Sequence, residues 1–323
     1  MSTRGTRTDP LVGLAAWTKP EITHVGRLPM RSPLPPAPDV STARGKDPNP
    51  WVRSLDGTWK FLLIERPEWA PADFMASDHR DAGWADIAVP GLWTMQGFDR
   101  PIYTNVQMPF KGVPPDVPAD NPTGLYRTTF SIPRAWSKRR IILHIGAADS
   151  VAHVWVNGVP VGISKDSRLE AAFDVTDSVK TGTNTLALMV VRWSDASYVE
   201  DQDQWWHAGI GRSVFLTATD RIWIEDVHAR PGWDPATGVG SLHVRTEVGF
   251  TGKPERDWTV RAQLETLTGR KVGRPLTGVV PTDRRAYLFS GHVVEADATE
   301  LAVEPWSSEA PNRYRLVVSL IDA

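Results

Sequence analysis

Residues 152–162 read AHVWVNGVPVG, two alternating apolar and polar runs separated by the dipeptide Asn157-Gly158. Both central residues of a type I′ turn need a positive φ, which asparagine and glycine tolerate best. An Asn-Gly pair between alternating runs is the strongest short-range signal of a β-hairpin. The sequence therefore predicts a tight two-residue hairpin here.

Short runs of the same kind fill the chain after residue 51, and no segment shows the pattern of an amphipathic helix of three turns. We expect strands at Trp59–Ile64, Leu125–Ile132, Ile141–Ile145, Thr185–Trp193 and Arg212–Thr219. Many short strands with turn residues between them indicate an all-β sandwich or jelly roll.

A second set of strands begins near Arg221. We expect Ile222–Ile224, Leu242–Val248, Trp258–Leu264, Tyr287–Val294 and Tyr314–Ile321, with a turn at 268–270. About five strands in about 100 residues have the size of an immunoglobulin-like sandwich. The chain stops on a strand, so we expect this second sandwich to be truncated at its C-terminal end.

The segment before these strands has a different composition. Residues 29–50 are dense in proline and lack periodicity, which predicts an extended arm rather than a folded element. The segment around Trp17 is too short to fold alone, so we expect it to lie across another surface.

Composition excludes several classes of function. With 36 Lys+Arg against 38 Asp+Glu, the chain has no basic excess for a nucleic acid. The absence of cysteine excludes disulfides and thiolate metal sites and fits a cytoplasmic protein. No apolar run approaches the length of a membrane span, and the N-terminal apolar run is short for a secretory signal.

Residues 192–207, RWSDASYVEDQDQWWH, combine carboxylates with large aromatic side chains. The carboxylates are Asp195, Glu200, Asp201 and Asp203, and the aromatics are Trp193, Tyr198, Trp205 and Trp206. A loop of about 15 residues between two strands is longer than a simple connection requires. Carboxylates accept bonds from hydroxyls or ligate hard cations, and indoles pack on apolar faces such as those of sugar rings. Either a sugar site or a loop that satisfies itself, anchored by Arg192 and Arg212, fits this composition; most of the 15 tryptophans are expected in the core.

Asn105 lies in PIYTNVQMPF, an irregular loop with several neutral hydrogen-bonding groups. Asparagine in such a loop can form an Asx turn or present its amide to a ligand. The spacing of the acids in 192–207 matches no EF-hand, and the eight histidines lack metal-ligand spacing. Phosphate-binding, serine-hydrolase and kinase motifs are also absent from the sequence.

Six runs in order carry a family resemblance: SLDGTWKF, VPGLWTMQGFDRPIYTNVQMPF, ADNPTGLYRTTF, VWVNGVPVGISKDSRLEAAFDV, RWSDASYVEDQDQWWHAGIGR and EPWSSEAPNRYRLVV. Together they resemble the N-terminal third of lac-type bacterial β-galactosidases of glycoside hydrolase family 2. The resemblance implies an N-terminal arm (1–50), a jelly-roll sugar-binding domain (51–219) and an immunoglobulin-like β-sandwich (220–323), with the catalytic TIM barrel absent from this chain.

The resemblance also implies roles for individual residues. Asn105 matches an asparagine that reaches the galactose site, and Asp203 matches an aspartate that contacts the galactosyl group and ligates sodium. The family hydrolyses with retention through two glutamates on the barrel, where the catalytic magnesium ligands also lie. We therefore assign no catalytic residue here and expect the chain alone to be inactive.

A structural magnesium site of the family is altered in this sequence. Asp195 matches one of its ligands, but Ala16, Lys19 and Lys165 stand where the resemblance places the others. Two lysines in place of ligands put the magnesium in doubt. We predict instead that an ammonium group, that of Lys165, pairs directly with Asp195.

The resulting hypothesis is the N-terminal part of a β-galactosidase that hydrolyses terminal non-reducing β-D-galactose residues. Its expected partners are a β-galactoside and the remainder of the enzyme, either in the same polypeptide or on another chain. We expect the complete enzyme to form a homo-oligomer. Two alternatives stay open: a non-catalytic carbohydrate-binding module, and a structural subunit that completes a barrel on another chain.

Overall fold

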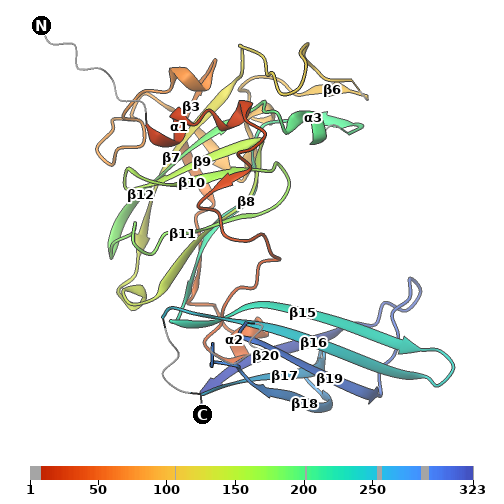
Figure 1. Cartoon of the computed structure of the whole chain (residues 1–323). Helices are drawn as coiled ribbons and strands as arrows, with labels where there is room; N and C mark the ends of the chain where they lie inside the picture. The colour runs from red at the N-terminus through yellow and green to blue at the C-terminus, as the bar shows by residue number, and fades with distance from the viewer. Residues whose placement is uncertain (1–8, 106, 201, 253–256, 285–290, 323) are drawn as a thin grey trace, which may run out of the picture. The chain divides into compact units, whose positions relative to one another are not determined.

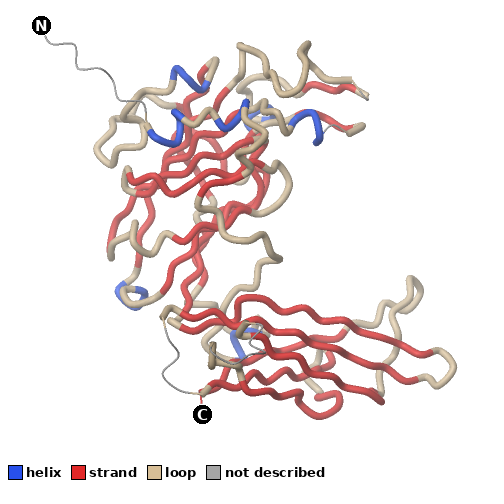
Figure 2. The backbone as a smooth tube through the Cα atoms, in the orientation of Figure 1, coloured by secondary structure: helices blue, strands red, loops and turns tan. Residues whose placement is uncertain are grey.

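The computed structural model describes residues 9–105, 107–200, 202–252, 257–284 and 291–322. The chain forms two compact units, the first built from the segment up to residue 31 with 52–218, the second from 32–51 with 219–323. Strands dominate both units (Figures 1 and 2). The α-helices of the described residues are single turns: α1 (Pro10–Gly13), α2 (Val40–Ala43) and α3 (Ser197–Glu200). None of these helices is long or apolar enough to span a membrane.

The first unit is a jelly roll of two main sheets. Its seven-stranded sheet has the order β1-β10-β9-β12-β7-β3-β4, and its five-stranded sheet includes β11-β8-β14-β2 with β5 beside β14. The strands are β1 (His24–Val25), β2 (Val52–Ser54), β3 (Gly57–Ile64), β4 (Ala85–Val89), β5 (Gly91–Leu92), β7 (Thr123–Ile132), β8 (Arg140–Asp149), β9 (Val151–Val156), β10 (Val159–Lys165), β11 (Ala171–Asp174), β12 (Gly182–Val191) and β14 (Gly209–Thr219). All five strands predicted for this region are present.

The predicted hairpin is confirmed. β9 and β10 are joined by Asn157 (φ 53°) and Gly158 (φ 77°), and Val156 pairs with Val159 across the turn. The Asn157 side chain also donates from Nδ2 to the Ser178 carbonyl (2.8 Å), which fastens the turn to the loop between β11 and β12.

Aromatic side chains fill the jelly-roll core. Trp59, Trp93 and Trp155 are fully buried, and the Phe61 ring lies 4.8 Å from that of Tyr126. Seven of the 15 tryptophans are buried, fewer than the sequence led us to expect. The exposed ones are Trp69, Trp205, Trp233 and Trp306.

The arm is divided between the two units rather than extended throughout. Its first part packs on one face of the seven-stranded sheet, where Trp17 is 3% exposed and belongs to the same apolar cluster as Trp155. The prediction that the Trp17 segment lies across another surface is confirmed. The part from residue 32 onward joins the second unit and includes α2.

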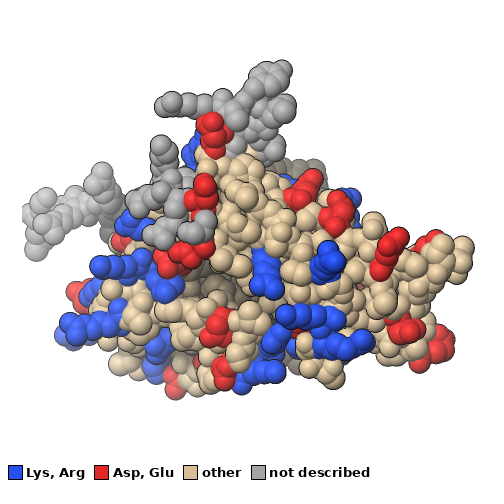
Figure 3. Space-filling view, turned by 90° about the horizontal axis from the view of Figure 1, so that it is seen from below, with Lys and Arg blue, Asp and Glu red and all other residues tan. Residues whose placement is uncertain are grey.

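The second unit is an immunoglobulin-like sandwich of two three-stranded sheets, β15-β16-β19 and β18-β17-β20. The strands are β15 (Ile222–Asp234), β16 (Val239–Phe250), β17 (Trp258–Thr266), β18 (Lys271–Val279), β19 (Val293–Leu301) and β20 (Tyr314–Asp322). Arg44 directly follows α2. Its guanidinium donates two hydrogen bonds to the Glu265 carboxylate in an ion pair, and the Glu265 side chain is 2% exposed. On the face drawn in Figure 3, acidic and basic side chains are interspersed.

Two strand predictions in this unit need correction. β15 extends from residue 222 to 234, not only to 224, because it pairs with β16 along its whole length. The strand predicted at Tyr287–Val294 falls partly on residues 285–290, which lie outside the described residues, and the observed β19 begins only at Val293. The chain as described is all-β and contains no barrel, as predicted.

Candidate functional site

A two-stranded antiparallel sheet joins the two loops that carry the predicted substrate residues. β6 (Ile102–Thr104) pairs with β13 (Gln204–Trp206), with Tyr103 opposite Trp205. Gln204 pairs with Thr104, so Asp203 and Asn105 occupy the next opposed positions in this register. Both residues are exposed. Asn105 directly follows β6 and Asp203 directly precedes β13, so the two residues flank the same end of this sheet although they are about 100 residues apart in the sequence.

The Asp203 carboxylate is held from one side. The Tyr103 hydroxyl donates to Asp203 Oδ1 over 2.6 Å, and this hydrogen bond raises the pKa of Tyr103. The bond is charge-assisted, so it fixes one carboxylate oxygen while the side chain stays exposed to solvent.

An exposed aromatic pair lies beside this carboxylate. The Tyr103 and Trp205 rings are 5.5 Å apart, and the two side chains are 50% and 55% exposed. Large exposed rings beside a fixed carboxylate offer both an apolar face and a hydrogen-bond acceptor. Sequence reasoning did not single out Tyr103.

The tryptophans of this loop divide between buried and exposed positions: Trp193 and Trp206 are buried, whereas Trp205 is exposed. Trp206 is 6% exposed, donates from Nε1 to Thr104 Oγ1 (2.7 Å) and packs 5.4 Å from the ring of Trp193. Adjacent strand residues point to opposite faces, so Trp206 turns inward and Trp205 outward. The strand period of Gln204-Trp205-Trp206 is the signal that could have identified the exposed indole.

Arg192 anchors the base of the site. Its side chain is 2% exposed and forms an ion pair with Asp99, while Nη2 donates to the carbonyls of Arg100 (3.1 Å) and Trp206 (3.3 Å). Burial lowers the pKa of Arg192, and Asp99 opposes that shift. Arg192 therefore binds the segment leading to Asn105 to the segment following Asp203. The second predicted anchor, Arg212, is exposed instead.

Glu200 has an internal role. It accepts hydrogen bonds from the backbone N–H (2.9 Å) and hydroxyl (2.6 Å) of Ser167, and burial raises its pKa. Glu200 is therefore part of the loop's own structure and is not aimed at a ligand. Asp201, the neighbouring acid of the motif, lies outside the described residues.

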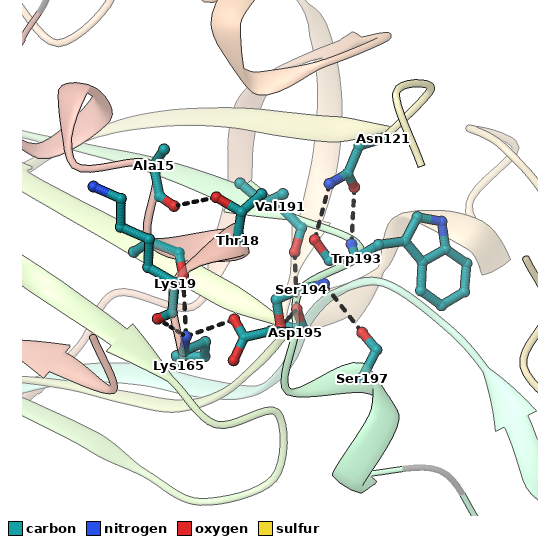
Figure 4. Close-up of polar contacts among 12 residues, drawn as sticks. Ala15, Thr18, Lys19, Asn121, Lys165, Val191, Trp193, Ser194, Asp195 and Ser197 are labelled. Atoms are coloured by element: carbon teal, nitrogen blue, oxygen red, sulfur yellow. Dashed lines mark hydrogen bonds and ion pairs between the residues drawn. The ribbon is translucent and has the colours of Figure 1, made fainter. Parts of the chain in front are cut away.

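The predicted pairing of Lys165 with Asp195 is confirmed (Figure 4). Lys165 Nζ lies 2.6 Å from Asp195 Oδ1 and also donates to the carbonyls of Ala16 (3.0 Å) and Lys19 (2.9 Å). An ammonium thus occupies the position between these oxygens, and a divalent cation there would meet its positive charge directly. The residues present do not fit the structural magnesium that the resemblance assigns to Asp195.

The remaining metal prediction concerns Asp203. Across the described ranges, three or more His, Asp or Glu side chains nowhere gather as a metal-binding group would. One exposed carboxylate, with one oxygen already bound to Tyr103, can contribute a ligand to sodium but is not a complete site. Sodium binding at Asp203 therefore stays a prediction.

Comparison with known proteins gives one family. The model described as "Glycosyl hydrolases family 2, sugar binding domain" matches residues 52–220. The chain is 38% identical over 311 residues to a β-galactosidase of Psychromonas ingrahamii and 41% identical over 313 residues to one of Photobacterium profundum. These alignments cover 95% of this chain but only 29% of each relative.

Solved structures share the fold. A β-glucuronidase of Bacteroides uniformis superposes with a TM-score of 0.63 at 22% identity, covering 84% of this chain and 30% of that one. A β-glycosidase of Bacteroides vulgatus gives a TM-score of 0.63 at 19% identity. At these identities the similarity extends to the architecture and not to the substrate.

Proposed function

The chain belongs to glycosyl hydrolase family 2, and on that premise we propose that it forms the N-terminal part of a β-galactosidase. The complete protein would remove terminal non-reducing β-D-galactose from β-D-galactosides with retention of configuration. The curated relatives named β-galactosidase support this substrate over the glucuronides that the names of some structural neighbours indicate.

One observation carries the proposal: Asn105 and Asp203 flank the same end of the β6–β13 pair, one residue beyond the last paired positions Thr104 and Gln204. An amide and a carboxylate together can donate to and accept from the vicinal hydroxyls of a sugar. The exposed Tyr103 and Trp205 rings beside them can pack on an apolar sugar face. We propose that Asn105 and Asp203 bind the substrate and that Asp203 contributes a ligand to sodium.

The hydrolytic step needs other residues. A retaining glycosidase uses two carboxyl groups about 5 Å apart, one as acid/base and one as nucleophile. Glu200 is bound to Ser167 and Asp203 to Tyr103, so neither is arranged as such a pair. We infer that the catalytic glutamates and the catalytic magnesium ligands belong to a barrel outside residues 1–323, and that these residues alone do not hydrolyse a galactoside.

The test uses the native polypeptide that contains this chain, purified from its source cells and assayed on aryl β-galactoside, β-glucuronide and β-mannoside. We expect the galactoside to give the highest kcat/KM. Asp203→Asn and Asn105→Ala should each lower that value by about tenfold to a hundredfold, the loss of a charged or buried hydrogen bond. Asp86→Asn, which changes an exposed carboxylate on β4, is the matched control and should have no effect.

Two results would overturn the proposal. A preference for the glucuronide or the mannoside would contradict the proposed galactoside substrate. Protein-dependent hydrolysis by purified residues 1–323 would contradict the inference that the catalytic residues lie outside them. The mass of the native polypeptide is measured first: a species several-fold heavier than 35.8 kDa supports a barrel in cis. A species at that mass would require a partner chain, which co-purification should reveal.

The exposed Tyr103–Trp205 pair favours a second candidate, a carbohydrate-binding module without catalysis. It predicts that residues 1–323 bind galactose measurably by titration calorimetry, and that Trp205→Ala abolishes that binding. Half a pocket buries little of a ligand, so we rank this candidate second. Homo-oligomeric assembly and a cytoplasmic location remain predictions from the sequence.

A further inference from the structure

Lys165, the last residue of β10, carries a fully coordinated buried ammonium group. Its side chain is 2% exposed, and Nζ has three oxygen partners within 3.0 Å: Asp195 Oδ1 and the carbonyls of Ala16 and Lys19. A lysine ammonium has three donors, so every one of them is used. A buried charge is tolerated only when it is paired and hydrogen-bonded, and this one is both.

The three oxygens belong to two segments that are far apart in the sequence. Ala16 and Lys19 belong to the short 3-10 turn of the arm, whereas Asp195 follows β12 at the start of the loop that leads to Asp203. The separations of 149 and 146 residues from Lys165 to the two arm carbonyls show that these contacts fix the arm to the sheet. Lys165 therefore links the arm, β10 and the loop at one point (Figure 4).

Neighbouring contacts make the same connection. The backbone N–H of Asp195 donates to the Trp17 carbonyl over 2.9 Å, so this aspartate binds the arm and the ammonium at once. Beyond the turn, β1 pairs with β10, with His24 opposite Ser164. The arm therefore contacts Lys165 or its immediate partners through the turn carbonyls, the Trp17 carbonyl and β1.

We propose that Lys165 is a built-in cation that fastens the N-terminal arm to the loop after β12, so that attachment of the arm requires no divalent metal. The ammonium neutralises Asp195 and satisfies two backbone carbonyls, which is the work a bound cation would otherwise perform. This inference does not rest on the proposed function, because arm attachment can be measured without a sugar.

The test is limited proteolysis of the chain with trypsin. Mass spectrometry measures the rate at which cleavage after Arg27 or Arg31 releases the arm. We expect the wild-type cleavage rate to be the same in EDTA and in excess Mg²⁺. Lys165→Met should raise that rate by about tenfold or more, because the arm opens locally when its buried contact is lost. Lys60→Met is the control: Lys60 forms an ion pair with Asp86, but both side chains are exposed (39% and 63%).

Each result bears on the proposal. Faster release of the wild-type arm in EDTA, or a Lys165→Met arm as protected as the wild-type arm, would overturn it. Should Lys165→Met fail to fold, the wild-type chelator comparison still decides, together with titration of the wild-type chain with Mn²⁺ followed by electron paramagnetic resonance. We expect to detect no Mn²⁺ binding that depends on Asp195. Mn²⁺ binding that Asp195→Asn abolishes would refute the built-in cation.

Discussion

Removing the Asp99 carboxylate should destabilise the jelly roll strongly, since it would leave the Arg192 guanidinium buried without a counter-charge. Arg192 is 2% exposed and Asp99 19% exposed, so the ion pair is largely shielded from water. In Asp99→Ala the guanidinium keeps two carbonyl acceptors, those of Arg100 and Trp206, but no negative partner.

The expected loss follows from this burial. Breaking a buried ion pair by removing one partner costs about 3–5 kcal/mol, whereas an exposed pair contributes less than about 1 kcal/mol. At roughly 2–4 °C per kcal/mol for a domain of this size, Asp99→Ala should lower Tm by about 6–20 °C. The matched control is Asp86→Ala, which breaks the exposed ion pair with Lys60 and should shift Tm by no more than about 4 °C.

The assay is thermal and urea unfolding of the whole chain followed by tryptophan fluorescence, with a double-mutant cycle. In the Arg192→Met background, Asp99→Ala should cost little, because no buried charge is left unpaired. The reasoning is refuted if Asp99→Ala costs the same with and without Arg192, or if it costs no more than Asp86→Ala.

Three further predictions follow from the site and the core. Trp205→Ala should leave stability within about 0.5 kcal/mol of wild type in urea unfolding, whereas Trp206→Ala should cost about 3–5 kcal/mol, because only the second indole is buried. Tyr103→Phe should leave Tm unchanged but raise KM for a galactoside in the complete enzyme, because it frees the Asp203 carboxylate; an unchanged KM would contradict this. Burial raises the pKa of Asp149 from 3.8 to about 7, so between these values the folded chain keeps a proton that the unfolded chain releases, and stability falls as pH rises. The free energy of unfolding of the wild-type chain should fall by on the order of 4 kcal/mol between about pH 4 and pH 7, and Asp149→Asn should not show this fall. The variant should therefore be more stable than wild type above about pH 7 and equally stable near pH 4.

The local sequence predicts the strands well because alternation and turn residues act over short distances. Asn157-Gly158 is an example, since both positive φ values needed by the turn are encoded in the two residues themselves. β15 was underestimated because its outer part, residues 225–234, includes Pro231 and Gly232 and is held as a strand by pairing with β16. Such pairing is a tertiary effect that outweighs the propensity of the single strand.

The candidate site could be predicted only in part. Asn105 and Asp203 were identified by resemblance, but their placement at one end of the same sheet depends on the pairing of β6 with β13 across about 100 residues, which no local pattern encodes. Lys165 could be predicted because it stands where a ligand was expected. Its partners at Ala16 and Lys19 could not, because they are backbone carbonyls, which every residue carries and which the sequence does not distinguish.

The ion pair between Arg44 and Glu265 bears on how the chain is made. Arg44 leaves the ribosome 221 residues before its partner, and at about 5–20 residues per second the delay is about 11–44 seconds. All of residues 52–218 are synthesised in that interval, so the first unit can fold while residues 32–51 still lack the sandwich that they join. Translation order therefore makes the second unit, although smaller, the later of the two units to be completed, and residues 32–51 must stay available for it in the nascent chain.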